Sequence, residues 1–194
     1  MSAVSIAEAW PAPGQPFTVD DLDRMPDDGR RYELLDGVLI VSPRPTTVHQ
    51  LAATRLATLL EIACPDELCV LAEPALQLSD DTEFDPDVVV VRWEDVGGAK
   101  ITAPPLLVVE IRSPSTALID LNRKKAAYQE LGVQCYWIVD PDPRLPSITA
   151  FELQEGQYTT VAEATGLEML DAEQPFPVEV VPALLLAGLL GQHR

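Results

Sequence analysis

The sequence predicts a single mixed α/β domain, and two kinds of pattern predict it. Short apolar runs rich in β-branched residues, typical of strands buried on both faces, occur at residues 88–91 and 106–109. Apolar residues at helical spacing occupy residues 49–63. Strands and helices that alternate along the chain favour a mixed central sheet flanked by helices. The length of 194 residues suits one compact domain, which we expect over 17–194 after a loose arm over 1–16.

Helix caps and turn residues indicate the remaining elements. Thr18 suits the N-cap of one helix, and Ser115 or Thr116 suits that of another. Asp36-Gly37 is the dipeptide preferred in two-residue hairpin turns. The expected order is helix 19–25, strands 31–35 and 38–42, helix 49–63, strands 69–78, 84–91 and 106–112, a helix ending at Gly132, strand 136–140, strands 148–153 and 157–162, and helix 183–190.

The charge of the chain argues against non-specific binding to nucleic acid. The formal net charge is −18, and affinity for a phosphate backbone depends on Lys and Arg. Four of the 13 basic residues nevertheless fall close together, at Arg112, Arg123, Lys124 and Lys125. A local basic site or a bound divalent cation therefore stays compatible with the composition.

The cysteines and the apolar stretches favour a cytoplasmic protein. Three cysteines without paired spacing fit a reducing compartment better than a disulfide framework or a zinc site. The N-terminus lacks the pattern of a signal peptide, and the longest apolar stretch, at 183–190, is far shorter than a membrane span. We therefore expect no membrane partner.

Acidic residues stand at the ends of the two most apolar runs. Glu110 follows 106–109 directly, and Asp85-Pro86-Asp87 leads into 88–91. A buried carboxylate without a partner costs several kcal/mol or takes up a proton, so each acid needs a cation, a metal or a hydrogen-bond donor. Two acids at the ends of two core strands therefore suggest one shared metal.

A cationic side chain is expected beside these acids. Strand alternation places Glu110 and Arg112 on one face, and Lys124 on the following helix can lean back over the strand end. Two carboxylates with a backbone carbonyl, such as that of Ile111, form an oxygen site suited to Mg²⁺ or Mn²⁺. Such a metal activates water and stabilises charge on a phosphate, which lysine also does. The implied chemistry is hydrolysis of a phosphodiester.

A set of short motifs runs along the chain. They are 32–34 (YEL), 36–37 (DG), 49–50 (HQ), 85–87 (DPD), 110–116 (EIRSPST), 120–124 (DLNRK), Tyr128, 131–133 (LGV) and 136–141 (YWIVDP). Together these motifs resemble the bacterial Uma-type restriction endonuclease family, of the PD-(D/E)XK nuclease superfamily. The resemblance covers roughly 17–141, and it is the combination of motifs that is specific, since a Pro-Asp pair alone occurs in many proteins.

The resemblance implies a role for individual residues. It places the metal-binding aspartate at Asp87 and the second acid at Glu110, the two acids that the oxygen site with the Ile111 carbonyl already joins. The lysine of the superfamily motif falls at Arg112, which cannot exchange a proton near neutral pH. In the Uma-type family the lysine stands on the following helix, so Lys124 is the favoured catalytic cation and Arg112 assists.

The resemblance also implies a restriction-endonuclease-like core, with a mixed central sheet, flanking helices and additional hairpins. A DNA substrate, Mg²⁺ or Mn²⁺ as cofactor and a homodimer complete the expectation.

Other interpretations stay open at this point. Glu110 can be a structural ion-pair partner without a metal, and Glu33 can be either a third acid of the site or an exposed hairpin residue. His49 fits a capping or surface histidine better than a phosphate contact, and Tyr128 fits the core. A catalytically inactive scaffold of the same fold is a second function, favoured by the net charge and by Arg112. A metal-dependent enzyme acting on a smaller phosphorylated substrate is a third.

Overall fold

The computed structural model describes residues 11, 14–112 and 118–189, with the backbone alone for 118–121. Most of the expected arm over 1–16 lies outside these residues, as do the expected caps Ser115 and Thr116.

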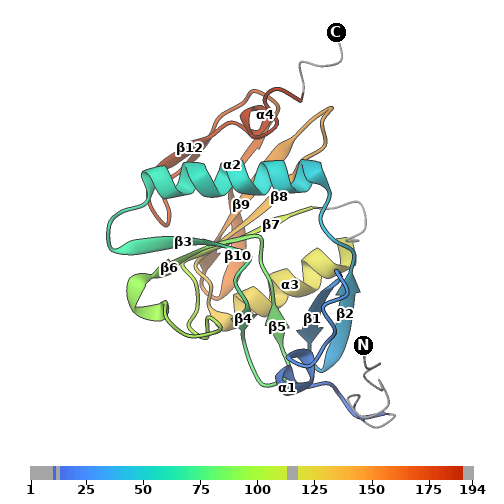
Figure 1. Cartoon of the computed structure of the whole chain (residues 1–194). Coiled ribbons are helices and arrows are strands. Elements are labelled where there is room, and N and C mark those ends of the chain that lie inside the picture. The colour runs from blue at the N-terminus through green and yellow to red at the C-terminus, as the bar shows by residue number, and fades with distance from the viewer. Residues whose placement is uncertain (1–10, 12–13, 113–117, 190–194) are drawn as a thin grey trace.

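A six-stranded sheet forms the centre of the fold (Figure 1). Its order is β10-β9-β8-β7-β6-β3, and β7 and β8 are the parallel pair, joined by helix α3. Helix α2 packs on one face of this sheet and α3 packs on the other. The bounds are α2 Thr47–Ala63, β3 Leu68–Ala72, β6 Val88–Arg92, β7 Leu107–Ile111, α3 Leu118–Leu131, β8 Cys135–Asp140, β9 Ser147–Gln154 and β10 Gln157–Thr165.

Two smaller sheets flank the central one. The first has the order β2-β1-β5-β4, and the second pairs β11 with β12. Thr18 caps the short helix α1 and accepts from the Asp21 backbone N–H, as its sequence position predicts. The bounds are α1 Val19–Leu22, β1 Arg31–Leu35, β2 Val38–Ser42, β4 Leu76–Gln77, β5 Glu83–Phe84, β11 Leu170–Ala172, β12 Val178–Val180 and α4 Pro182–Leu185, with a 3₁₀ turn, η2, at Trp93–Asp95.

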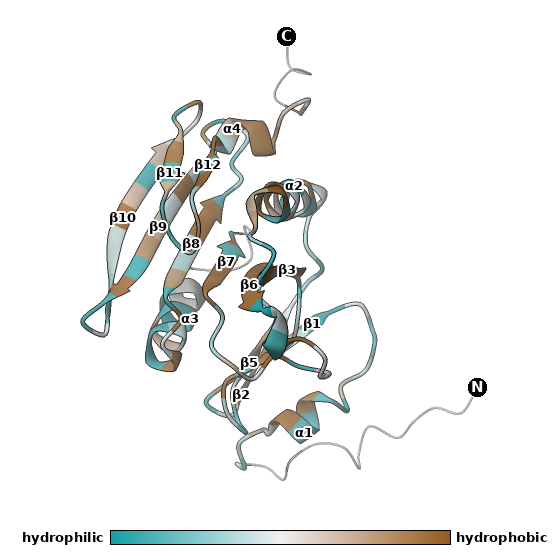
Figure 2. Ribbon diagram, turned by 90° about the vertical axis from the view of Figure 1, so that its left-hand side faces the viewer, coloured by the Kyte–Doolittle hydropathy of each residue, from teal (hydrophilic) through white to brown (hydrophobic). Residues whose placement is uncertain are grey.

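Strand alternation divides the core into two apolar layers. Val88 and Val109 belong to the layer under α2, whereas Val89 and Val108 belong to the layer under α3. Both faces of β6 and β7 are therefore covered, which explains why their sequences are continuously apolar. Figure 2 shows these central strands as hydrophobic segments enclosed by the surrounding elements. Any charged side chain on β7 must consequently find its partner inside the protein.

Several expected elements are interrupted or shorter than predicted. The strand expected over 69–78 is two strands in different sheets, because Glu73 adopts a left-handed backbone with φ 49° and Pro74 follows it. The strand expected over 84–91 breaks at Asp85-Pro86, because Pro86 has no backbone N–H to donate to a strand ladder. Helix α4 has four residues where a helix over 183–190 was expected, and the pair β11 and β12 was not predicted.

The described helices include none with the length and apolarity needed to cross a membrane.

Candidate active site

Four charged side chains from four different elements converge at one end of the central sheet. Glu110 lies on β7, Asp87 directly precedes β6, Glu33 lies on β1 and Lys124 lies on α3. Their exposed fractions are 5%, 1%, 3% and 6%, so all four are withdrawn from solvent. Charges buried to this degree must satisfy one another, and the contacts between them show how they do so.

Lys124 holds two of the acids. Its Nζ donates to Glu33 Oε1 at 2.7 Å and to Glu110 Oε1 at 3.2 Å. One turn further along α3, the Tyr128 hydroxyl donates to the same Glu110 oxygen at 2.7 Å. The prediction that Lys124 reaches Glu110 from the following helix is therefore confirmed, and Tyr128 serves both the core and the site.

Asp87 is held by donors from three directions. Its Oδ2 accepts from the Ile111 backbone N–H at 2.7 Å and lies 3.2 Å from His49 Nε2, while its Oδ1 lies 3.4 Å from Arg31 Nη1. Burial alone would raise the pKa of Asp87, but the bonds from His49 and Ile111 and the charge of Arg31 hold that pKa below its ordinary value. Asp87 is therefore an ionised carboxylate fixed at the strand end.

Glu110 is in the opposite electrostatic situation. Burial raises its pKa to about 7; Lys124 opposes this rise, and the negative charges of Asp87 and Glu33 add to it. Burial would lower the pKa of Lys124, but Glu110 and Glu33 raise it above the ordinary lysine value. Lys124 is therefore a permanent cation, and Glu110 is the group that gains or loses a proton near neutral pH.

The residues around Asp87 fit a divalent metal. His49 Nε2 lies 3.0 Å from the Ile111 carbonyl oxygen and 3.2 Å from Asp87 Oδ2. In this structure Nε2 donates a hydrogen bond toward these oxygens, so it can bind a metal only as the tautomer that carries its proton on Nδ1. The two hydrogen bonds that Glu110 accepts from described residues, Lys124 and Tyr128, are both accepted by Oε1. Its other oxygen can therefore act as a ligand without breaking them.

A backbone oxygen is needed to complete such a site. In the part of the chain that the structure describes, no three His, Cys, Asp or Glu side chains are grouped closely enough to hold a metal by themselves. The Ile111 carbonyl oxygen lies 3.0 Å from His49 Nε2, and its role as a metal ligand stays a prediction. An imidazole among oxygen ligands favours Mn²⁺ over Mg²⁺, because imidazole suits transition metals.

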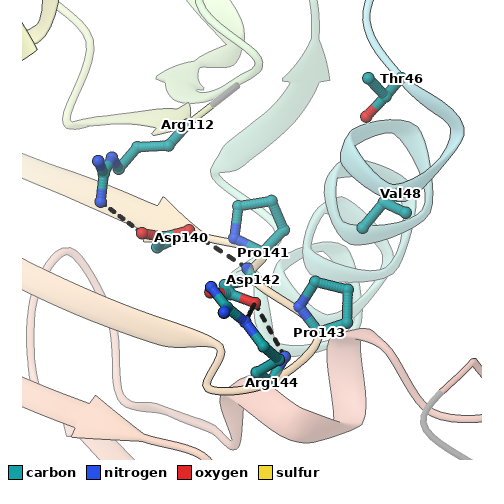
Figure 3. Close-up of a pocket in the computed structure, with 8 residues that line it drawn as sticks. All are labelled: Thr46, Val48, Arg112, Asp140, Pro141, Asp142, Pro143 and Arg144. Atoms are coloured by element: carbon teal, nitrogen blue, oxygen red, sulfur yellow. Dashed lines mark hydrogen bonds and ion pairs between the residues drawn. The ribbon is translucent and has the colours of Figure 1, made fainter. Parts of the chain in front are cut away.

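Arg112 does not join this cluster. Arg112 directly follows the last residue of β7, and its side chain pairs with Asp140, the last residue of β8. Figure 3 shows this pair in the wall of a cavity of about 470 Å³ beside the start of α2. The structure brings Asp87, Glu110, Ile111 and Lys124 together, and it places Arg112 in a separate ion pair.

Sequence reasoning underestimated three residues of the site. The interpretation of His49 as a surface residue is wrong, and so is that of Glu33 as an exposed hairpin residue, because both side chains are buried. Arg31, which contacts Asp87, was not predicted as a site residue. A signal for His49 was present: the buried residues of α2 are His49, Ala52, Ala53, Leu56 and Leu60. A histidine in line with the apolar face of a helix points into the protein and needs a polar partner there.

Comparison with known proteins places this chain in a family. The Uma2 family model, described as "Putative restriction endonuclease", matches residues 19–187. The crystal structure of a "putative nuclease belonging to DUF820" from Anabaena variabilis has the same fold, with a TM-score of 0.69, 19% identity, and coverage of 88% of this chain and 97% of that one. No curated protein matches the chain. The two matches confirm the expected mixed α+β, restriction-endonuclease-like fold, and the chain belongs to the Uma2 family.

Proposed function

We propose that this protein is a metal-dependent endonuclease that hydrolyses phosphodiester bonds of DNA. The observation that carries the proposal is the buried contact of Lys124 with Glu110 beside the ligand-like grouping of Asp87, Ile111 and His49. A site with two acids, a carbonyl, an imidazole and a fixed ammonium has the parts that phosphodiester hydrolysis requires. Membership of the Uma2 family and the fold of the Anabaena nuclease support the same chemistry.

Each residue of the site has its own role in the proposed reaction. Asp87, Glu110, the Ile111 carbonyl and His49 would hold Mg²⁺ or Mn²⁺, which supplies an activated water and a positive charge next to the phosphate. Glu110 must lose its proton before it can bind a metal, because a protonated carboxyl is a poor ligand. Lys124, anchored by Glu33 and Glu110, keeps its positive charge where the phosphate gains negative charge during attack.

A plasmid-nicking assay tests the proposal. Supercoiled DNA is incubated with wild type, Glu110→Gln, Lys124→Met and Arg112→Gln in Mg²⁺ or Mn²⁺, with EDTA as the blank. We expect nicking by wild type that is stronger in Mn²⁺, and losses of roughly a hundredfold or more in the first two variants. Because Arg112 pairs with Asp140 outside the cluster, Arg112→Gln should retain most of the activity.

Folding of each variant is checked by circular dichroism, since Lys124→Met leaves two buried acids without their cation. Absence of nicking by folded wild type, together with no metal-induced rise in melting temperature, would contradict the proposal and favour an inactive scaffold of this fold. Loss of activity in Arg112→Gln but not in Lys124→Met would move the catalytic role to Arg112.

The homodimer implied by the family resemblance is tested separately by light scattering.

A further inference from the structure

A second cavity, of about 410 Å³, opens beside the acid cluster and carries three arginines on its wall. Arg30, Arg31 and Arg44 line it, and Arg30 is paired with Asp28 at 3.4 Å. The other polar residues of its lining are Gln50 and the acids Asp27, Glu73 and Asp85. In a chain with a net charge of −18, three of the 13 basic residues around one cavity are a marked local concentration. The position of this cavity relative to the proposed metal site therefore decides what it can bind.

Arg31 connects the cavity to the candidate active site. Its Nη1 lies 3.4 Å from Asp87 Oδ1, and its Nη2 donates to Glu73 Oε1 at 2.7 Å. Asp85, two residues before Asp87, also lines the cavity. A group bound on the outer side of Arg31 is therefore one side chain away from the Asp87 carboxylate.

The Glu73 carboxylate occupies the donors of this cavity. Its Oε1 accepts from Arg31 and, at 3.4 Å, from Gln50 Nε2. Glu73 has a left-handed backbone, with φ 49°, which a residue with a side chain seldom adopts, and its N–H donates to the Asp87 carbonyl at 3.2 Å. An unfavourable backbone conformation thus places an anionic oxygen between an arginine and an amide, which is also how proteins bind a phosphate oxygen.

Arg44 lines the same cavity. Its Nε donates to the Gly29 carbonyl at 3.0 Å, and among the described residues it has no carboxylate partner. A Cβ at Gly29 would lie 2.7 Å from that Nε, so the absence of a side chain there leaves room for the guanidinium. The side chain of Arg44 is exposed at the mouth, where a polyanion would meet it first.

We propose that this cavity binds backbone phosphates of the DNA substrate next to the bond that is cut, and that Glu73 holds the place of a phosphate until DNA displaces it. Arg31 and Gln50 then bind the incoming phosphate, and Arg44 binds its neighbour. The inference rests on the proposed function, because it assigns the substrate of the same site. It makes an unusual prediction: removal of one acidic side chain should tighten DNA binding.

Fluorescence anisotropy with a labelled single-stranded oligodeoxynucleotide in EDTA tests this without cleavage. Glu73→Gln should bind the oligonucleotide roughly two- to fivefold more tightly than wild type. The factor is small because the Glu73 side chain is partly exposed, so solvent screens its charge. Arg44→Gln should bind more weakly by a similar factor, with the slope of log affinity against log salt smaller by about 0.7. Glu130→Gln and Arg24→Gln remove the same charges at exposed positions outside the cavity and control for net charge.

Three results would overturn the proposal. One is a Glu73→Gln protein that binds no more tightly than Glu130→Gln, and another is an Arg44→Gln protein with an unchanged salt slope. The third is displacement of the oligonucleotide by a mononucleotide at equal phosphate concentration, which would assign the cavity to small phosphate esters.

The nicking assay keeps the two proposals apart. Plasmid nicking by wild type with unchanged binding in the cavity variants would refute the phosphate cavity and leave the nuclease intact. The expected binding shifts without any metal-dependent nicking would support the cavity as a DNA site and refute the hydrolytic function.

Discussion

Replacing Glu110 with glutamine should stabilise the metal-free protein at alkaline pH. Burial raises the pKa of Glu110 to about 7, against 4.5 for an exposed glutamate. Because the folded-state pKa is the higher one, the stability contributed by the protonated carboxyl is fully present below about pH 4.5 and is lost as the pH rises through 7. Above that pH the wild-type protein carries a buried negative charge that the amide of Glu110→Gln does not.

The structure sets the size of this effect. The difference between the two pKa values corresponds to roughly 3 kcal/mol, and this figure already includes the opposing charge of Lys124. A glutamine has the same shape, and its carbonyl can still accept from Tyr128 and Lys124. We therefore expect Glu110→Gln to be about 1–3 kcal/mol more stable than wild type at about pH 8, and the two to be nearly equal at about pH 5.

Urea denaturation in EDTA at both pH values measures the difference, with Glu130→Gln as an exposed control that should show little change. If Glu110→Gln were less stable than wild type at both pH values, Glu110 would be an ionised partner of Lys124 throughout. The reasoning from burial would then be refuted.

Three further results are expected. Stabilisation of wild type by Mn²⁺ should increase as the pH rises through about 7, because metal binding requires loss of the Glu110 proton; melting curves at several pH values measure this, and a pH-independent shift would contradict it. Tyr128→Phe removes a 2.7 Å hydrogen bond to the Glu110 carboxyl, so it should cost about 1–2 kcal/mol in urea and move the Mn²⁺ profile to higher pH; an unmoved profile would show that Tyr128 is only a core residue. Gly37→Ala should cost at least about 1 kcal/mol, because Gly37 has φ 72° and a Cβ would lie 2.5 Å from the Pro16 Cβ; unchanged urea stability would contradict this turn geometry.

Much of the site could be predicted because it depends on local patterns. Glu110 follows an apolar run, and Lys124 is 14 residues later on a helix that must cross back over the sheet to reach a parallel strand. A crossover of this kind brings the first turns of the helix close to the end of the preceding strand. The contact between Lys124 and Glu110 was therefore predictable from the chain itself.

The unpredicted parts depend on contacts between segments far apart in the sequence. Glu33 reaches Lys124 across 91 residues, and Arg31 reaches Asp87 across 56. Neither pairing has a signature in the local sequence, because the hairpin of β1 and β2 could have packed with either face toward the core. The left-handed backbone at Glu73 is likewise a product of tertiary structure, although Pro74 signals that a strand cannot continue there.

The position of the lysine follows from where the strand ends. Arg112 is beyond β7, its backbone N–H donates to the Val139 carbonyl at 2.8 Å, and its side chain meets Asp140 at the end of the parallel neighbour β8. A lysine at this position would start from the same backbone, so its ammonium would be directed to Asp140 as well. Lys124 instead approaches Glu110 from the α3 side of the sheet, where Tyr128 and Glu33 already surround that carboxyl. In the proposed hydrolysis the ammonium that stabilises the phosphate therefore comes from α3 and not from the end of β7.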